Sequence, residues 1–244
     1  MVQLFSMIRE VEASLLADAP LFAGLDAAAI ARVAASGQLV AKPAGAAFFD
    51  QGDPADAFFL LADGQVRIVQ VTPEGHLVTL RYIGPGQVFG AVPLFAGGPY
   101  PAGAIAVLGS RAARWTHTAA RRLAEVYPPL LANALAIVGR RLQEMQDRYR
   151  EMATERVERR VARAVLHLAG RRSDGAAGVE IDFPISRQDI AELTGTTLST
   201  VSRILSAWEQ KGMLEGGRMH IRVTRPDRLR AIADAIEAAA DRQK

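Results

Sequence analysis

Apolar residues recur with different spacings in three zones of the chain. Residues 1–35 predict helix, with Leu25 and Ile30 on one apolar face and Asp26 placed as an N-cap. Residues 38–115 consist of short apolar or alternating runs that are separated by glycine-containing turns. Short strands at such regular spacing are typical of a barrel or a double-sheet jelly roll. These two zones therefore predict an α+β fold whose N-terminal domain is a barrel or a jelly roll.

The best-defined strands lie in the middle of the second zone. The runs 66–71 and 78–82 both read as strands, and the turn Pro73-Glu74-Gly75-His76 separates them. We expect the two runs to pair as a β-hairpin of the roll.

The third zone is helical from about Thr118 and carries an apolar seam. Its apolar positions are spaced alternately by four and three residues: Leu131, Leu135, Val138, Leu142, Met145, Tyr149 and Met152. Sustained heptads with charged neighbours are typical of a helix that pairs with a copy of itself. We expect a dimerisation helix over residues 119–152 and a domain boundary near residue 153. The alternative is a seam that packs on its own domain.

Composition narrows the class of protein. The chain is 50% hydrophobic and 23% charged, which is usual for a folded domain. It contains no cysteine, which excludes disulfides, thiolate zinc sites and cysteine-ligated iron–sulfur clusters. No apolar run reaches the roughly 18 residues that cross a bilayer, and the N-terminus does not have the pattern of a signal peptide. We therefore expect a cytoplasmic protein.

The positive charge of the chain lies in its C-terminal part. Residues 153–244 contain 16 Lys or Arg and 13 Asp or Glu, whereas residues 1–152 contain 13 of each, so the whole net charge of +3 comes from the former. This asymmetry fits a C-terminal domain that meets a polyanion. An excess of three charges also arises by chance, so the motifs matter more.

The most informative stretch is ISRQDIAELTGTTLSTVSRILSAWEQKGML, residues 185–214. Ser186 and Asp189 have the spacing of a capping box at the start of a short helix. Gly195 follows where a tight turn between two helices needs a residue that can adopt positive φ. Thr197 can then cap a second helix. The pattern predicts a helix-turn-helix that reads DNA.

The exposed start of the second helix provides the candidate DNA contacts. Short hydroxyls and an arginine at this place, Ser199, Ser202 and Arg203, suit the major groove, where arginine can hold O6 and N7 of guanine. The candidates for the DNA backbone are Ser186, Arg187, Gln188, Thr197, Thr200 and Arg218, the last in a predicted wing. A three-helix packing unit without DNA is the alternative, but it needs neither the glycine nor the arginine-bearing outer face.

The chain resembles the CRP/FNR superfamily of transcription regulators over nearly its whole length. The glycine-punctuated roll, the long seam and the stretch SRQDIAELTGTTLSTVSRIL carry this resemblance. It implies a roll domain over residues 1–118, a dimerisation helix over 119–152 and a winged helix-turn-helix over 153–244. It also implies a homodimer on a palindromic TTG/CAA-like operator that activates RNA polymerase, with Ser199, Ser202 and Arg203 as base readers. The oxygen-responsive branch has glutamate where this chain has Ser199, so the half-site is expected to differ there.

The resemblance also locates an effector pocket, at Phe89, Gly90, Ala91, Tyr100 and Pro101. Cyclic-nucleotide binders of the family have a glutamate where this chain has Ala91, and Arg-Ser where it has Tyr100-Pro101. Without that arginine the phosphate would be desolvated and unpaired, which costs several kcal/mol. A neighbouring arginine such as Arg81 is a substitute that keeps the cyclic-nucleotide alternative open.

The segment YPA and the helix-turn-helix are most similar to the NnrR/Dnr-type branch, which implies a nitric oxide response through haem and control of denitrification genes. The chain has four histidines, His76, His117, His167 and His220, and each suits an ordinary surface or packing role, so no metal ligand is named. Two alternatives remain: a regulator that needs no ligand, and a cupin-like enzyme. The second requires a histidine cluster that the roll, with only His76, does not contain.

Overall fold

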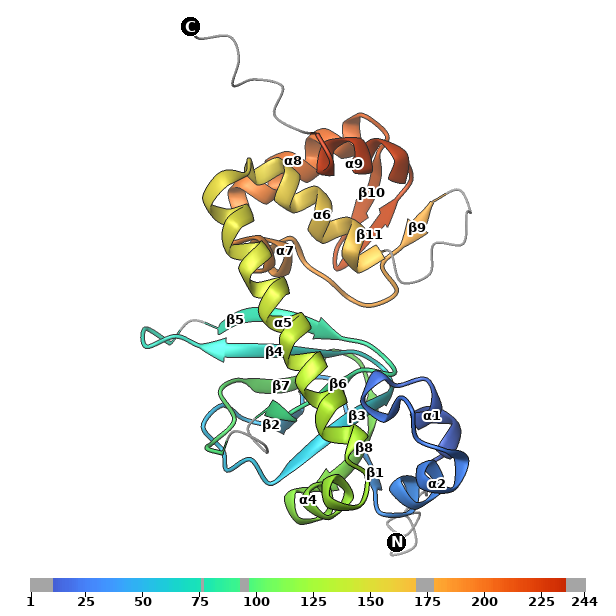
Figure 1. Ribbon diagram of the computed structural model, residues 1–244. Helices are drawn as coiled ribbons and strands as arrows, with labels where there is room; N and C mark the ends of the chain where they lie inside the picture. Colours follow the sequence, from blue (N-terminus) through green and yellow to red (C-terminus); the bar gives the residue numbers. More distant parts are fainter. Residues whose placement is uncertain (1–10, 76, 93–96, 170–177, 236–244) are drawn as a thin grey trace, which may run out of the picture. The chain divides into compact units, whose positions relative to one another are not determined.

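The computed structural model describes residues 11–75, 77–92, 97–169 and 178–235 (Figure 1). The chain forms two compact units, Met1–Glu144 and Met145–Lys244. Two stretches on which expectations rested, His76 and residues 93–96 of the effector cassette, lie outside the described residues. The α+β class, with a β-roll, a long helix and a helix-turn-helix, is confirmed.

Short helices precede the roll in the first unit. They are α1 (Ala13–Ala17), a 3-10 turn (Pro20–Phe22) and α2 (Ala27–Ala35). The expected cap at Asp26 is confirmed, since its carboxylate accepts a hydrogen bond of 2.7 Å from the amide of Ala29. This cap satisfies an amide that would otherwise have no partner in the first turn of α2.

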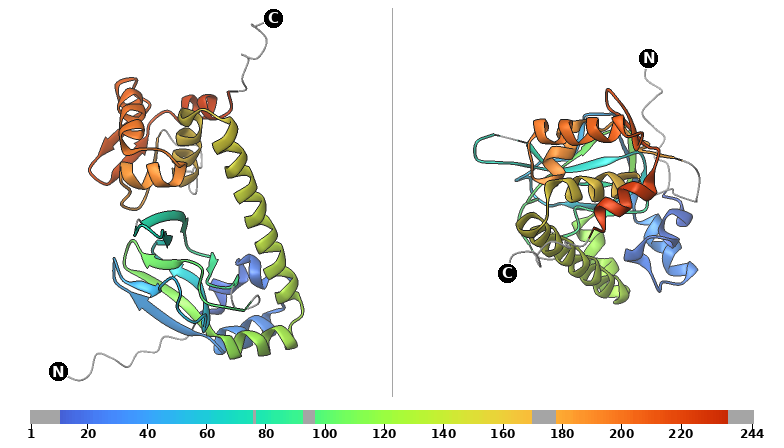
Figure 2. Two further views of the ribbon diagram at one scale, coloured as in Figure 1. Left: turned by 90° about the vertical axis from the view of Figure 1, so that its left-hand side faces the viewer. Right: turned by 90° about the horizontal axis from the view of Figure 1, so that it is seen from above.

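The roll consists of two antiparallel four-stranded sheets that face each other (Figure 2). One sheet has the order β1-β8-β3-β6 and the other β2-β7-β4-β5. The strands are β1 (Gln38–Lys42), β2 (Ala47–Phe49), β3 (Ala57–Asp63), β4 (Val66–Val71), β5 (Leu77–Ile83), β6 (Val88–Phe89), β7 (Gly103–Ala106) and β8 (Ser110–Thr116). The expected hairpin is β4–β5, which pairs from Val66–Ile83 to Val71–Leu77 with a bulge after Ile68.

Strand β3 separates two apolar cores, which explains why its sequence AFFLL is continuously apolar rather than alternating. Phe58 and Leu60 point to the helices, where Phe58 stacks on Trp115 with 5.0 Å between ring centroids. Phe59 and Leu61 point into the space between the two sheets. Both faces of this strand are therefore buried.

The segment expected as one dimerisation helix over residues 119–152 is two helices, α4 (His117–Val126) and α5 (Pro129–Thr154), so its expected continuity was wrong, while its role in dimerisation stays a prediction. Tyr127 leaves the helical region, with φ −123° and ψ 81°, because the residue before a proline avoids that region. Pro129 then occupies the first turn of α5, where a missing amide hydrogen is tolerated. The seam itself lies entirely on α5.

The N-terminal part of α5 is fastened to the first unit. Asn133 donates hydrogen bonds to the carbonyls of Leu21 (3.0 Å) and Ala23 (2.8 Å). Arg141 donates one of 2.7 Å to the carbonyl of Val88, and burial lowers the pKa of its guanidinium. These contacts leave the seam residues of α5 exposed.

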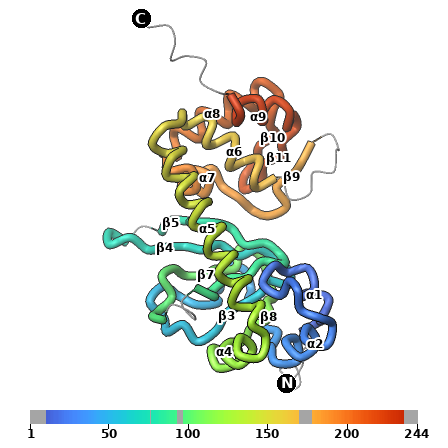
Figure 3. Tube along the Cα trace, viewed as in Figure 1, coloured from blue at the N-terminus to red at the C-terminus, as the bar shows by residue number. Residues whose placement is uncertain are grey.

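The second unit is a helical domain with a β-hairpin wing (Figure 3). It comprises α6 (Val157–Ala169), β9 (Val179–Glu180), α7 (Arg187–Thr194), α8 (Leu198–Gln210), β10 (Leu214–Gly217), β11 (His220–Val223) and α9 (Pro226–Ala233), with the sheet order β10-β11-β9. The division between the units falls inside α5, after Glu144, which is earlier than the boundary near residue 153 that the sequence suggests. The reason is that the last turns of α5 bond to α6.

Candidate DNA-binding surface and effector pocket

The turn between α7 and α8 forms as the local sequence predicts. Ser186 and Asp189 make both hydrogen bonds of a capping box at the start of α7. Gly195 ends α7 in the left-handed region, with φ 61° and ψ 45°. This left-handed backbone favours glycine, and a Cβ atom on Gly195 would also lie 2.9 Å from Sδ of Met152, whose flexible side chain would have to move aside.

Helix α8 has one buried and one exposed face. Thr197 caps it by accepting from the amide of Thr200. Its buried residues are Val201, Ile204, Leu205 and Trp208. On the other side Ser199 and Arg203 are exposed and Ser202 is half-buried, so the three predicted base readers lie along one accessible face. This is the geometry that a recognition helix needs to reach base edges.

Leu198, the first residue of α8, is a candidate contact that sequence reasoning missed. Its side chain is 46% exposed, next to the predicted readers. An apolar side chain in water at this place has no packing role to explain it. The apolar pattern alone could not have found it, because Leu198 keeps the three- and four-residue spacing of the buried residues Val201, Leu205 and Trp208.

Several predicted backbone contacts are engaged within the domain. Arg187 forms an ion pair of 2.9 Å with Glu209 and donates to Ser206 (3.0 Å), which fastens the start of α7 to α8. Gln188 donates to Glu192 at 3.2 Å. Ser186 belongs to the capping box, and the hydroxyls of Thr197 and Thr200 lie 2.9 Å apart. These side chains shape the domain, and the backbone amides of Ser186 and Thr200 also donate hydrogen bonds within it, to Asp189 and Thr197.

The wing is a hairpin with an unusual tip. Strands β10 and β11 pair from Leu214–Val223 to Gly217–His220. Met219 adopts a positive φ of 61°, a conformation that few residues other than glycine take. Arg218 is exposed at the tip, where the sequence predicted a phosphate contact.

The seam of α5 is an exposed apolar stripe in the single chain. Its members are Leu131 (48% exposed), Leu135 (72%), Val138 (38%), Leu142 (56%), Met145 (68%), Tyr149 (75%) and Met152 (51%). A stripe of this length in contact with water is costly for a monomer and marks an interaction surface. None of these side chains belongs to the buried core of the described residues.

The residues expected to form the effector pocket divide between two cores. Phe89 and Tyr100 are buried between the sheets, where the Tyr100 ring stacks on Phe49 with 3.8 Å between centroids. Gly90 adjoins them, and a Cβ there would lie 3.1 Å from the Phe49 ring. Ala91 packs against the helix-side core instead, and Pro101 is exposed. The five residues therefore do not line one cavity.

Tyr100 is fixed by its hydroxyl as well as by its ring. The phenol donates to the carbonyl of Ala57 at 2.6 Å and accepts from the amide of the same residue at 3.2 Å. Burial raises the pKa of Tyr100, so the group stays neutral at physiological pH. In the described residues no cluster of three or more His, Cys, Asp or Glu side chains has metal-binding geometry.

Comparison with known proteins identifies the family. Residues 159–232 match the Crp-like helix-turn-helix domain and residues 39–127 match the cyclic nucleotide-binding domain. The "Cyclic AMP receptor protein" of Thermus thermophilus is 31% identical over 214 residues, which cover 88% of this chain and 96% of that protein. The chain belongs to the CRP/FNR superfamily.

Further relatives and solved structures are also similar to this chain. The "CRP-like cAMP-activated global transcriptional regulator" of Mycobacterium tuberculosis is 28% identical over 201 residues, or 82% of this chain and 90% of that one. The solved "Catabolite Activator Protein" of Thermus thermophilus is 30% identical, covers 88% of this chain and 98% of its own, and has a TM-score of 0.52. FixK2 from Bradyrhizobium japonicum, at 22% identity, shows the same fold with a TM-score of 0.72 over 82% of this chain and 98% of its own.

As a CRP/FNR protein the chain is a DNA-binding transcription regulator, and its relatives are regulators rather than enzymes. The cupin-like alternative is thereby set aside. Members of this family are typically dimers. The NnrR/Dnr-type branch is a finer assignment that these relatives do not test. Within the described ranges no helix has both the length and the apolar content to span a bilayer.

Proposed function

We propose that two copies of this CRP/FNR protein pair through α5 and activate transcription by binding a palindromic TTG/CAA-like operator and contacting RNA polymerase. The observation that carries the proposal is the exposed, polar start of α8, which presents Ser199, Ser202 and Arg203. The exposed seam on α5 supports the pairing, because two copies that bury it would place two such helices about one symmetry axis.

Two exposed side chains of α8, Arg203 and Leu198, have chemical counterparts in a TTG half-site. The Arg203 guanidinium matches O6 and N7 of guanine with two hydrogen bonds. Leu198, which is 46% exposed, fits against the methyl group of thymine. Ser199 discriminates weakly among bases because a hydroxyl both donates and accepts. We therefore expect the operator to be well defined at guanine and thymine and degenerate at the base pair beside Ser199.

Arg203→Ala is expected to weaken operator binding by about 1–3 kcal/mol and to relax the preference for one base pair. The measurement is fluorescence anisotropy of a labelled TTG/CAA inverted repeat and of a scrambled duplex. Arg218→Ala serves as the matched control, because an exposed wing arginine that contacts phosphate should weaken both duplexes equally. Equal, weak binding of the unmodified protein to both duplexes would contradict the proposal.

The signal is the second part of the proposal. The match to a cyclic nucleotide-binding domain and the names of the relatives favour a cyclic nucleotide. The residues of this roll do not favour a cyclic nucleotide. Tyr100 presents a neutral ring where the family holds the phosphate with arginine, and the Tyr100 hydroxyl is bonded to Ala57. The charge of Arg114 does reach the Tyr100 hydroxyl, but Arg114 forms an ion pair of 2.8 Å with Asp56 and would have to leave it to offset the desolvation of a phosphate.

The described residues suit haem no better than they suit a cyclic nucleotide. A response to nitric oxide through haem, and control of denitrification or anaerobic genes, is what the NnrR/Dnr resemblance implies. His117 and His167 are exposed on α4 and α6, and His220 lies in the wing. Tyr100, the candidate ligand in the cassette, already uses its oxygen in two hydrogen bonds. We therefore assign no step to haem and propose that the dimer binds its operator with no ligand in the roll.

Operator affinity is accordingly expected to be the same with and without cyclic AMP. The measurement is the anisotropy titration repeated at saturating cyclic AMP, and again after incubation with haem and nitric oxide, with absorption spectra recorded alongside. A tenfold gain in affinity would correspond to about 1.4 kcal/mol of coupling and would overturn the ligand-free proposal. A haem Soret band that shifts from that of free haem would restore the haem alternative.

A further inference from the structure

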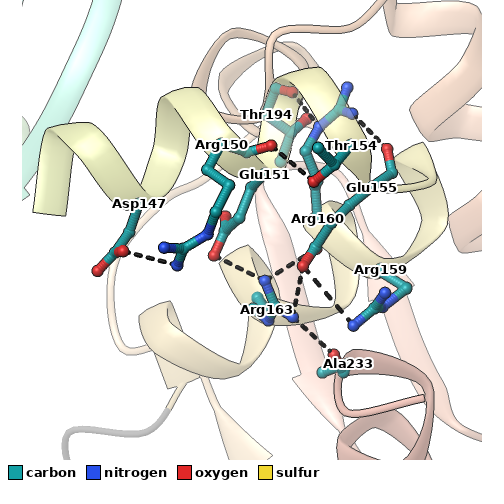
Figure 4. Close-up of polar contacts among 10 residues, drawn as sticks. All are labelled: Asp147, Arg150, Glu151, Thr154, Glu155, Arg159, Arg160, Arg163, Thr194 and Ala233. Atoms are coloured by element: carbon teal, nitrogen blue, oxygen red, sulfur yellow. Dashed lines mark hydrogen bonds and ion pairs between the residues drawn. The ribbon is translucent and has the colours of Figure 1, made fainter. Parts of the chain in front are cut away.

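The elbow between α5 and α6 is held by arginines of α6. Helix α5 ends at Thr154 and α6 begins at Val157, so Glu155 lies in the bend. Arg163 donates to both carboxylate oxygens of Glu155, at 2.8 and 3.0 Å, and Arg159 lies 3.6 Å from the same carboxylate (Figure 4). Arg160 donates to the backbone carbonyl of Glu155 at 2.9 Å. The side-chain carboxylate and the backbone carbonyl of Glu155 thus both accept hydrogen bonds from arginines of α6.

The same arginines reach beyond the elbow. Arg163 also donates to Glu151 on α5 (2.6 Å) and to the carbonyl of Ala233 at the end of α9 (3.0 Å) (Figure 4). Arg160 also donates to the carbonyl of Thr194, the last residue of α7, at 3.1 Å. The Arg163 guanidinium therefore joins α5, the bend and α9. The Arg160 guanidinium joins the bend to the turn of the helix-turn-helix.

The last turns of α5 belong to the same body as the helix-turn-helix. The side chain of Met152 lies against Gly195 at the α7–α8 turn. The seam residues Met145, Tyr149 and Met152 fall in the C-terminal compact unit. Whatever fixes this part of α5 to α6 therefore fixes these three seam residues relative to α8.

The Arg163 contacts differ in kind from a surface ion pair. The side chains of Arg163, Glu151 and Glu155 are 33%, 25% and 15% exposed, whereas those of Arg150 and Asp147 in a pair within α5 are 70% and 54% exposed. Burial by itself lowers the pKa of Arg163, but the hydrogen bonds and charges of Glu155 and Glu151 outweigh it and raise the pKa. The guanidinium thus stays charged and held in one geometry, which exposed pairs seldom are.

We propose that Arg163 is a positioning residue for operator recognition: by locking the α5–α6 elbow it holds the two recognition helices of the dimer at one separation. This inference rests on the proposed function, because it requires a dimer on a palindrome. Half-sites that two helix-turn-helix domains read lie about 34 Å apart, one turn of DNA. A domain that swivels at the elbow would accept several spacings and gain less from binding both half-sites at once.

The test compares the unmodified protein with Arg163→Met on labelled TTG/CAA inverted repeats whose spacer varies in steps of one base pair, and on a single half-site. The unmodified protein should prefer one spacing strongly. Arg163→Met should lose about tenfold or more at that spacing, bind all spacings within about threefold of one another, and bind the single half-site as before, because the gain from bivalency depends on geometry. Glu151→Gln should show a smaller loss of the same kind.

Arg225→Met is the matched control, since Arg225 pairs with Asp227 two residues away and joins no separate elements. It should keep the original spacing preference. An Arg163→Met protein that keeps that preference, or one that also loses half-site binding, would overturn the inference. A failure of the unmodified protein to prefer any palindrome would instead count against the proposed function.

Discussion

A Leu142→Glu protein is expected to run as a monomer and to bind the palindromic operator about 10²–10⁴-fold more weakly than the unmodified protein, because the second half-site is then no longer bound intramolecularly. Leu142 is 56% exposed in the middle of the seam, so the substitution removes no core contact. In a dimer the two introduced carboxylates would face each other across the helix pair, in an apolar strip that desolvates charge. Light scattering after size exclusion gives the mass, and anisotropy gives the affinity.

The matched control for this experiment is Val126→Glu. Val126 is 63% exposed near the end of α4, outside the seam, so the same change in polarity should leave the mass and the affinity as they were. A Leu142→Glu protein that remains dimeric with full operator affinity would show that the seam packs elsewhere. That was the alternative left open by the heptad pattern alone.

Trp208→Ala is expected to destabilise the C-terminal unit by about 3–5 kcal/mol, the usual cost of removing a large buried aromatic side chain. Trp208 has no exposed surface, and its indole nitrogen donates a hydrogen bond of 3.1 Å to Glu158 on α6. The substitution opens a cavity behind the recognition helix and leaves that carboxylate without its donor. Operator binding should fall with stability, because the face carrying Arg203 depends on this packing.

Urea denaturation can assign the effect to one unit, because each unit contains one tryptophan. Trp115 is buried in the first unit and Trp208 in the second. In the Trp208→Ala protein the fluorescence of Trp115 should still report the original transition of the roll, while circular dichroism shows the helical unit unfolding at lower urea. Trp208→Phe, which keeps a ring but loses the hydrogen bond, should cost less. An unshifted dichroism transition would mean that Trp208 packs less tightly than described.

The helix-turn-helix could be predicted because its determinants are local. The capping box at Ser186, the glycine at position 195 and the cap at Thr197 act within a few residues of themselves, and the structure shows each as expected. The pairing of strands β4 and β5 could likewise be predicted from their sequence. Where a few neighbouring residues decide the backbone, sequence is sufficient.

Contacts between distant segments could not be predicted in the same way. The partner of Arg187 is Glu209, 22 residues away, and that of the Tyr100 hydroxyl is Ala57, 43 residues away. Nothing in either local pattern specifies these partners, since they depend on how α7 meets α8 and how the sheets close. The break at Tyr127 is different, because it could have been predicted from Pro128 and Pro129. The expectation of one helix followed the heptad spacing and did not take these prolines into account.

The separation of faces on α8 has an evolutionary consequence. The residues that hold the helix, such as Leu205 and Trp208, are buried, while Ser199 and Arg203 are exposed, and the Ser199 hydroxyl bonds only to that of Thr197 in the same turn among the hydrogen bonds of the described residues. Substitutions at such exposed sites usually change stability by no more than about 0.5 kcal/mol. A duplicated gene could therefore acquire a new set of target promoters through one or two changes on this face, with no compensating change in the rest of the chain.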